Sequence, residues 1–495
     1  MNIVWFKKDL RVVDHKPLVK ASASELIALY IIEPDLWALE DMSKRQYEFM
    51  TESLLDLKEA LRSIGIELTI RVGVAENILK DMVAEYNIDT VFAHEETSTK
   101  WVNERNQRVR AMLEQNNAAF QEYPQTGVVR HLVSRDGWAK LWYQFMQSPI
   151  YSVPSSLQGI EIQSDRIPTA SELGLDDCQC IDRQVGGRGQ GLTILHSFLS
   201  ERGEPYTKAM SSPITAWSHC SRLSPYIAFG CISMREVFHA TEARRVEIQE
   251  LSPGSKGKWG SAIRSFSARL RWHCHFIQKL EDEPRIEYEN LHTAYNGLRE
   301  NAFNDAYFTA WKQGNTGYPM IDACMRSLIA TGWLNFRMRA MLVSFASYHL
   351  WLDWRPTSKY LATLFTDYEP GIHYSQFQMQ SGTTGINTLR IYNPIKQGMD
   401  HDPQGEFIRK WIPELAHMED AYIHTPWECE AEINGYPMPI VDEKVARTYA
   451  REAFSAVRKR FTHKDEARKI VKKHGSRKRT NKKPKIDPQG ELPLE

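Results

Sequence analysis

The spacing of apolar residues changes once along this 495-residue chain, and the change constrains its fold more than any other feature. Before about residue 130, short apolar runs alternate with amphipathic stretches of helical spacing, Lys44–Ile64 and Ala75–Tyr86. Strands that alternate with helices form βαβ units, in which a parallel sheet has helices on both faces. Such sheets bind ligands beyond the carboxyl ends of their strands. The expected strands are Ile3–Phe6, Glu25–Ile32, Ile66–Val72, Asp89–His94 and Phe120–Tyr123.

The later part of the chain has the spacing of helices instead. Apolar residues recur at i, i+3 and i+4, most clearly between Ile321 and Trp333. A chain of this length exceeds one small domain. We therefore expect an α/β, Rossmann-like parallel-sheet domain over residues 1–131 and an all-α domain over residues 189–440. Residues 132–188 mix Pro, Ser, Asp and Gly, as is typical of an inter-domain connection.

The charges of the chain balance in number but not in position. Lysine and arginine together number 62, as do aspartate and glutamate, so the formal net charge is zero. Residues 451–486, however, contain 15 basic side chains and only three acidic ones. We expect residues 441–495 to form a basic C-terminal extension, helical at first and partly disordered at its end. It is either a solvated tail or an arm that binds a polyanion.

Composition also limits the compartment and the class of cofactor. Seven irregularly spaced cysteines fit reduced thiols, and no apolar run approaches the roughly 18 residues of a membrane helix. We therefore expect a cytoplasmic protein without a membrane partner. The phosphate-binding patterns of ATPases and of common dinucleotide enzymes are absent. The adjacent residues His273, Cys274 and His275 would diverge on a helix, so no metal site is predicted.

Four segments, in order along the chain, resemble the motifs of the photolyase/cryptochrome family of flavin-dependent blue-light proteins. They are Trp5–Arg11 (WFKKDLR), Ser221–Gly230 (SRLSPYIAFG), Trp311–Pro319 (WKQGNTGYP) and Arg390–Pro394 (RIYNP). The resemblance implies that the first domain is of the antenna type and that the helical domain binds FAD non-covalently, in a U shape. The family also uses an antenna chromophore, and the sequence does not specify whether one of folate or deazaflavin type binds here.

The resemblance assigns flavin contacts residue by residue. Ser221 and Ser224 lie beside a proline that can open a helix, where hydroxyl and free N–H groups suit a pyrophosphate, although plain capping uses the same residues. Arg339 and Asp367 match a charged pair beside the flavin ring, where the guanidinium stabilises negative charge on the reduced flavin; an ordinary buried ion pair is the alternative. The implied set is Tyr206, Ser221, Leu223, Ser224, Trp272, Phe276, Arg339, Asp367, Glu369 and His373.

The chain departs from the family at residues that matter for electron transfer. His373 stands where repair enzymes usually have asparagine, and we expect it to titrate near neutral pH. Trp354 keeps the middle position of the family's three-tryptophan chain, but Phe377 and Asn301 replace the outer two. We therefore expect an alternative route, for which the substitutes are Tyr374, Tyr392, Trp351 and Trp333. The catalytic candidates are Trp272, Trp354, His373 and Tyr374.

Two functions stay open at this stage. The first is a monomeric, light-driven DNA photolyase, a carbon–carbon lyase that splits pyrimidine dimers by electron transfer from reduced FAD. The second is a non-enzymatic, cryptochrome-like photoreceptor, which the replacement of the family's repair glutamate by Cys274 favours. We favour the photolyase, because the flavin and DNA-side motifs are largely kept. Its expected phosphate contacts are Arg337, Arg390, Lys396, Arg409 and Lys410, and Gln376, Gln378 and Gln380 offer amides for base edges.

Overall fold

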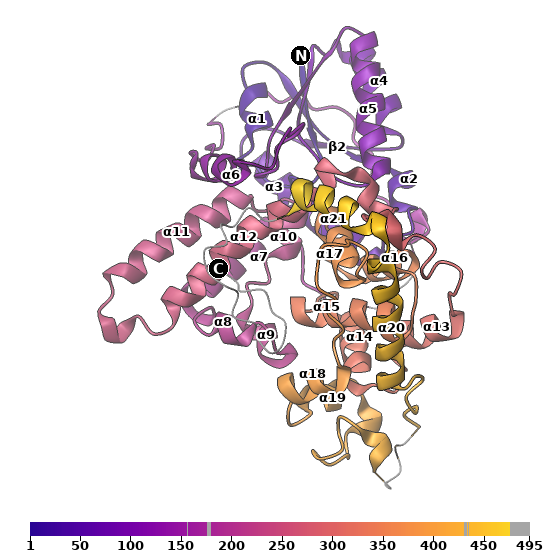
Figure 1. The fold of residues 1–495 in the computed structure, drawn as a ribbon. Helices are drawn as coiled ribbons and strands as arrows, with labels where there is room; N and C mark the ends of the chain where they lie inside the picture. Colours follow the sequence, from indigo (N-terminus) through magenta and orange to yellow (C-terminus); the bar gives the residue numbers. More distant parts are fainter. Residues whose placement is uncertain (156, 176–179, 430–432, 434, 476–495) are drawn as a thin grey trace.

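The N-terminal part of the computed structural model is a five-stranded parallel sheet (Figure 1). The structure describes residues 1–155, 157–175, 180–429, 433 and 435–475. The sheet has the order β3-β2-β1-β4-β5, so the direction of winding reverses at β1 and the sheet is doubly wound. This confirms the expected α/β fold class. The strands are β1 (Asn2–Phe6), β2 (Leu26–Ile32), β3 (Leu68–Val72), β4 (Thr90–His94) and β5 (Ala119–Tyr123).

Helices cover both faces of this sheet, because side chains alternate along each strand. Phe6 packs in a core with residues of α3, whereas its neighbour Trp5 packs in a separate core with residues of α4 and α5. Figure 1 shows α1 and α3 on one side of the sheet and α4 and α5 on the other. The helices as far as the second domain are α1 (Lys16–Ala21), α2 (Pro34–Trp37), α3 (Lys44–Arg62), α4 (Ala75–Tyr86), α5 (Lys100–Gln115) and α6 (Trp138–Gln147).

The second part is helical, which confirms the expected all-α domain. The apolar repeat noted in the sequence belongs to α14, where Ile321, Cys324 and Leu328 are fully buried. Gly332, with a φ of 68°, ends this helix in the left-handed region that glycine tolerates best. The helices are α7 (Arg188–Ser197), α8 (Tyr206–Ala209), α9 (Pro213–His219), α10 (Ser224–Ala228), α11 (Met234–Glu250), α12 (Trp259–Asp282), α13 (Asp305–Gln313), α14 (Pro319–Thr331), α15 (Phe336–Ser344), α16 (Trp354–Leu364), α17 (Pro370–Gln380), α18 (Pro394–His401) and α19 (Glu406–Trp411).

The connection between the two parts contains a packed helix, α6. Trp138, Trp142 and Met146 follow one another at four-residue intervals, and all three are buried. The ring of Trp142 meets that of Phe238 on α11 edge-on, with 5.7 Å between the centroids. This apolar stripe forms the helix, although the residues around it have the composition of a linker.

The basic extension folds back onto the helical part. Phe454, fully buried, packs with Tyr295 and Tyr348, and the Glu466 carboxylate accepts a hydrogen bond of 2.8 Å from the backbone N–H of Thr293. The extension contains α20 (Glu443–Arg458) and α21 (Phe461–His474). Residues 476–495, where partial disorder was expected, lie outside the described residues. Among the helices of the described part, none combines the length and the apolar character needed to cross a membrane.

Candidate functional site

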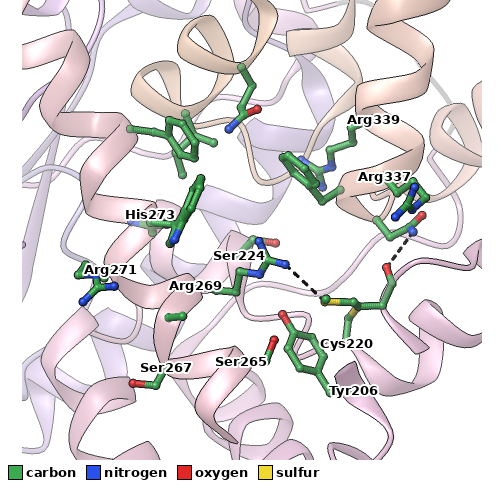
Figure 2. Close-up of a pocket in the computed structure, with 18 of the residues that line it drawn as sticks. Tyr206, Cys220, Ser224, Ser265, Ser267, Arg269, Arg271, His273, Arg337 and Arg339 are labelled. Atoms are coloured by element: carbon green, nitrogen blue, oxygen red, sulfur yellow. Dashed lines mark hydrogen bonds between the residues drawn. The ribbon is translucent and has the colours of Figure 1, made fainter. Parts of the chain in front are cut away.

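A cavity of about 1640 Å³ opens into the helical domain between α12, α15 and α17. Its volume exceeds the roughly 300–1,000 Å³ typical of sites for small molecules, so it has room for a ligand of dinucleotide size. Residues from α6, α8, α10, α11 and the segment before α18 also line it. Figure 2 shows its side chains converging from helices that are far apart in the sequence.

An ion pair forms part of the cavity wall. Arg339 on α15 donates two hydrogen bonds to the two carboxylate oxygens of Asp367, at 3.0 and 2.8 Å, and a third of 2.6 Å to the carbonyl of Leu334. The guanidinium also lies over the ring of Phe365, 4.1 Å from its centroid. The Asp367 side chain is 3% exposed and that of Arg339 is 26% exposed, so the cation is the more accessible partner. A cation held in this way can stabilise negative charge on a flat ring bound beside it.

Polar groups cluster in another part of the cavity, around the start of α10. Tyr206, Cys220, Ser224, Ser265 and Arg269 all line it and lie near one another in Figure 2. Burial raises the pKa of the Tyr206 hydroxyl to about 12 and that of the Cys220 thiol to about 12, so both stay neutral donors. Hydroxyls and a guanidinium suit phosphate oxygens. The ion pair and this cluster therefore together fit a dinucleotide that carries a flavin ring.

Two of the expected phosphate-segment residues lie elsewhere. Leu223 is 1% exposed and belongs to the hydrophobic core. Ser221 is not among the residues that line the cavity, and its backbone carbonyl accepts a hydrogen bond of 2.7 Å from Arg202. Of the segment from Ser221 to Ser224, only Ser224 reaches the cavity.

Helix α12 forms one whole wall of the cavity. Trp272 and Phe276, both expected from the sequence, line it, and so does His273, whose pKa burial lowers to about 4. Most residues of this wall were not predicted from the sequence. In the sequence, this wall can be recognised by a helix face on which small, hydroxyl and basic residues recur at i, i+3 and i+4, where apolar residues would be expected. These residues are Gly260, Ser261, Arg264, Ser265, Ser267, Ala268 and Arg271.

Helix α17, which packs directly against α12, forms the adjoining part of the wall. Glu369 and His373 line the cavity, and burial raises the pKa of the Glu369 carboxyl. His373 Nε2 donates a hydrogen bond of 2.9 Å to the carbonyl of Ser358, which leaves Nδ1 as an acceptor. Burial lowers the pKa of His373 to about 4. The expected titration near neutral pH is therefore wrong: the ring stays neutral, because its charged form would lose hydration.

Aromatic residues continue from the cavity into the core. Phe377 lines the cavity, with its ring 4.7 Å from that of His373. Tyr374 and Trp354 do not line it; their centroids are 6.5 Å apart, and the Tyr374 ring is 5.4 Å from His373. Trp354 Nε1 donates a hydrogen bond of 2.8 Å to Asn290. These two catalytic candidates therefore lie one layer behind the wall.

The expected DNA contacts divide into two groups. Arg337 and Arg390 line the cavity. Lys396 on α18, with Arg409 and Lys410 on α19, lies outside it: Lys396 pairs with an aspartate one turn later at 3.6 Å, Arg409 with Asp420 at 2.7 Å, and Lys410 lies over the neighbouring tryptophan ring. Five further lysine and arginine residues of the described cavity wall were not predicted from the sequence: Arg245, Lys256, Arg264, Arg269 and Arg271.

A second cluster of titratable groups lies at the carboxyl ends of β1 and β4. The Asp9 carboxylate accepts hydrogen bonds from His15 Nε2 at 2.9 Å and His94 Nδ1 at 2.7 Å, an arrangement compact enough to surround an ion. His15 Nδ1, however, accepts the backbone N–H of Leu18 at 3.1 Å, so the ring proton resides on Nε2. Since Asp9 already accepts that proton, we assign the cluster a structural role.

Family models match both parts of the chain. A model described as "DNA photolyase" matches residues 2–134. A second, described as "FAD binding domain of DNA photolyase", matches residues 266–456, which include α12, α15 and α17.

Curated relatives and solved structures match along nearly the whole chain. Deoxyribodipyrimidine photo-lyase of Escherichia coli (strain K12) is 28% identical over 481 residues, covering 92% of this chain and 99% of that protein. Cryptochrome DASH of Gloeobacter violaceus is 27% identical over 477 residues, covering 89% and 93%. A bacterial class III photolyase from Agrobacterium tumefaciens superposes with a TM-score of 0.80 at 27% identity, covering 93% and 98%. An archaeal photolyase from Sulfolobus tokodaii, described with two FAD molecules, has a TM-score of 0.76 at 26% identity, covering 92% and 100%.

Proposed function

This chain belongs to the photolyase/cryptochrome family of blue-light flavoproteins, its cofactor is FAD, and we propose that it is a DNA photolyase of the deoxyribodipyrimidine type. When bound, FAD supplies light-driven electron transfer that splits a pyrimidine dimer without net redox change. The chain's own residues order the cofactor and the DNA. Arg339, oriented by Asp367, stabilises negative charge on the flavin, and the cluster around Tyr206 and Ser224 holds the phosphates.

The observation that carries the proposal is that the ion pair and two further arginines line one cavity. Arg337 and Arg390 line the same cavity as the Arg339–Asp367 pair, and Phe336, 50% exposed, lies beside them. Guanidinium groups bind the DNA backbone, and an exposed ring can pack against a base turned out of the helix. Lys396, Arg409 and Lys410 extend the proposed phosphate contacts beyond the residues that line the cavity.

Removal of dimers in light tests this proposal. A defined oligonucleotide with one thymine dimer is mixed with protein that contains reduced FAD, as single and as double strand, and the remaining dimer is measured after blue light or darkness. We expect loss of the dimer only in light. Equal amounts in light and darkness would contradict the photolyase, and a purified protein without yellow absorbance would contradict any light-driven role.

A cryptochrome-like photoreceptor is the second candidate, and one observation favours it. Cys274, at the family's repair-glutamate position, is fully buried and is not among the residues that line the cavity. The acidic residues of the described cavity wall are Glu242, Asp367 and Glu369. A photoreceptor would keep light-driven flavin reduction while it left the dimer intact, so both readouts from one sample distinguish the two functions.

The proposal includes two features of the assembled protein. It acts as a monomer on DNA with pyrimidine dimers. It also takes a second, antenna chromophore, as the description of the Sulfolobus tokodaii structure with two FAD molecules indicates for that protein. Extraction of the purified protein and chromatography of the released chromophores checks the second feature.

A further inference from the structure

Two glutamines on one face of α17 have unused hydrogen-bonding groups in the cavity wall. Gln376 and Gln380 lie four residues apart and both line the cavity. Gln380 is 2% exposed. In the described structure, the amide oxygen and the amide nitrogen of each side chain are shielded from solvent and make no hydrogen bond. Polar groups that are buried without partners cost free energy, so this pattern indicates a missing ligand.

The glutamine between them serves as an internal comparison. Gln378 donates to the carbonyls of Ile286, at 3.0 Å, and Glu289, and its amide oxygen accepts the backbone N–H of Leu291 at 2.9 Å and the hydroxyl of Thr383 at 2.8 Å. It is fully satisfied and does not line the cavity. Residues two apart on a helix point in different directions. Gln378 therefore has a structural role, which Gln376 and Gln380 do not share.

The chemistry of the two free amides selects the kind of group they can bind. Each amide offers a donor and an acceptor, and side chains four apart on a helix lie side by side. Together they match a ring edge that presents a carbonyl, an N–H and a second carbonyl in sequence. Met379 and Tyr392 line the same cavity and offer surfaces against which a flat ring can pack.

We propose that Gln376 and Gln380 bind the imide edge of a pyrimidine ring in this cavity. The inference rests on the proposed function, because two rings present that edge there: the pyrimidine base of a DNA substrate and the pyrimidine portion of the flavin. Pairs of hydrogen bonds from an amide to a base edge discriminate strongly between rings. The two glutamines are thus specificity residues for one of these rings.

Isosteric substitutions test the proposal in two arms. Gln376→Leu and Gln380→Leu remove the amides at nearly constant volume, Gln380→Glu keeps the shape and removes the donor, and Gln144→Leu on the exposed side of α6 is the matched control. The DNA arm measures binding of a single-stranded oligonucleotide with one thymine dimer against its undamaged counterpart. The flavin arm measures FAD affinity of the apoprotein and the visible spectrum of the loaded protein.

If the base is the ligand, each cavity variant weakens dimer binding about tenfold, while binding of undamaged DNA and of FAD stays as in the control. If the flavin is the ligand, FAD affinity falls by a similar factor and the visible bands shift. Unchanged values in both arms, with correctly folded variants, would overturn the proposal. A wild-type protein that binds no dimer would contradict the photolyase function alone, because the flavin arm still reports on the two amides.

Discussion

Asp367 determines the position of Arg339, a cation of α15 that lines the cavity. Its two oxygens take both terminal nitrogens of Arg339. We expect Asp367→Asn to lower FAD affinity and to destabilise the apoprotein by about 2 kcal/mol, because the half-buried guanidinium loses a charged partner. Flavin absorbance after desalting and urea unfolding measure the two effects. Asp81→Asn, on the exposed side of α4, is the matched control and should change neither.

Trp354 and Tyr374 form the proposed electron route from the core to the cavity. The Tyr374 hydroxyl lies 3.4 Å from the Asp41 carboxylate, which can accept its proton on oxidation. We expect Trp354→Phe to abolish light-driven flavin reduction at unchanged flavin content, because phenylalanine carries an electron hole poorly. Absorbance during blue illumination with an external reductant measures the rate. An unchanged rate would exclude Trp354 from the route.

A second pair of tryptophans, Trp333 and Trp217, offers an alternative electron route that can be tested in the same way. Trp333 lines the cavity, and its ring centroid lies 5.9 Å from that of Trp217, which is 40% exposed. The guanidinium of Arg222 lies between them, 3.9 and 4.2 Å from the two centroids, and its charge opposes a positive hole on either ring. We therefore expect Trp217→Phe to retain photoreduction. Loss in this variant and not in Trp354→Phe would reverse the assignment.

The family motifs predicted the site residues that stand at motif positions of this sequence. Arg339, Asp367 and Trp272 occupy positions that the family resemblance assigns, and all three line the cavity. Gln380 was one of three alternating glutamines, and the sequence could not separate it from Gln378 because helix orientation decides which amide is used. The tautomer and pKa of His373 could not be predicted from the sequence either, because they depend on the hydrogen bond to the Ser358 carbonyl and on burial.

At the scale of elements, α20 shows that the basic extension has a hydrophobic side. We expect Phe454→Ala to destabilise the protein by about 3 kcal/mol, because the ring is fully buried against Tyr295 and Tyr348 and its removal leaves a cavity. Urea unfolding measures the change. Val445→Ala, on the same helix and 68% exposed, is the control and should fall within about 0.5 kcal/mol of the wild type.

Periodicity predicted elements better than composition did. Strands and long helices follow from apolar spacing, which is why the sheet and α14 agree with expectation. α6 lies in the inter-domain connection, where the buried stripe of Trp138, Trp142 and Met146 stands among residues typical of linkers. The extension begins as a helix, as expected, but its charge did not predict that Phe454 and Val457, three residues apart on α20, form a buried face. In both cases a narrow apolar stripe, and not the average composition, forms the helix.

For the whole molecule, the uneven charge distribution predicts how DNA binding responds to salt. The terminal residues 476–495 carry six basic and three acidic side chains. If this end contacts phosphates, deleting residues 476–495 lowers the number of counterions that are released when DNA binds. The slope of log affinity against log salt concentration then becomes less steep by about 0.9 for each lost contact. Oligonucleotide titrations at several salt concentrations measure the slope. An unchanged slope would mean that basic residues of the described part, such as Arg337 and Arg390, carry the salt dependence.

The return of α20 to Tyr295 and Tyr348 also bears on how the protein is made. During synthesis the N-terminal sheet is complete once β5 has left the ribosome, and domains of this kind fold early. The helical domain is completed later, because Phe454 of α20 forms a small separate cluster with Tyr295 and Tyr348, which precede it by far in the sequence. The contact between Phe454 and the two tyrosines therefore forms only after α20 has left the ribosome.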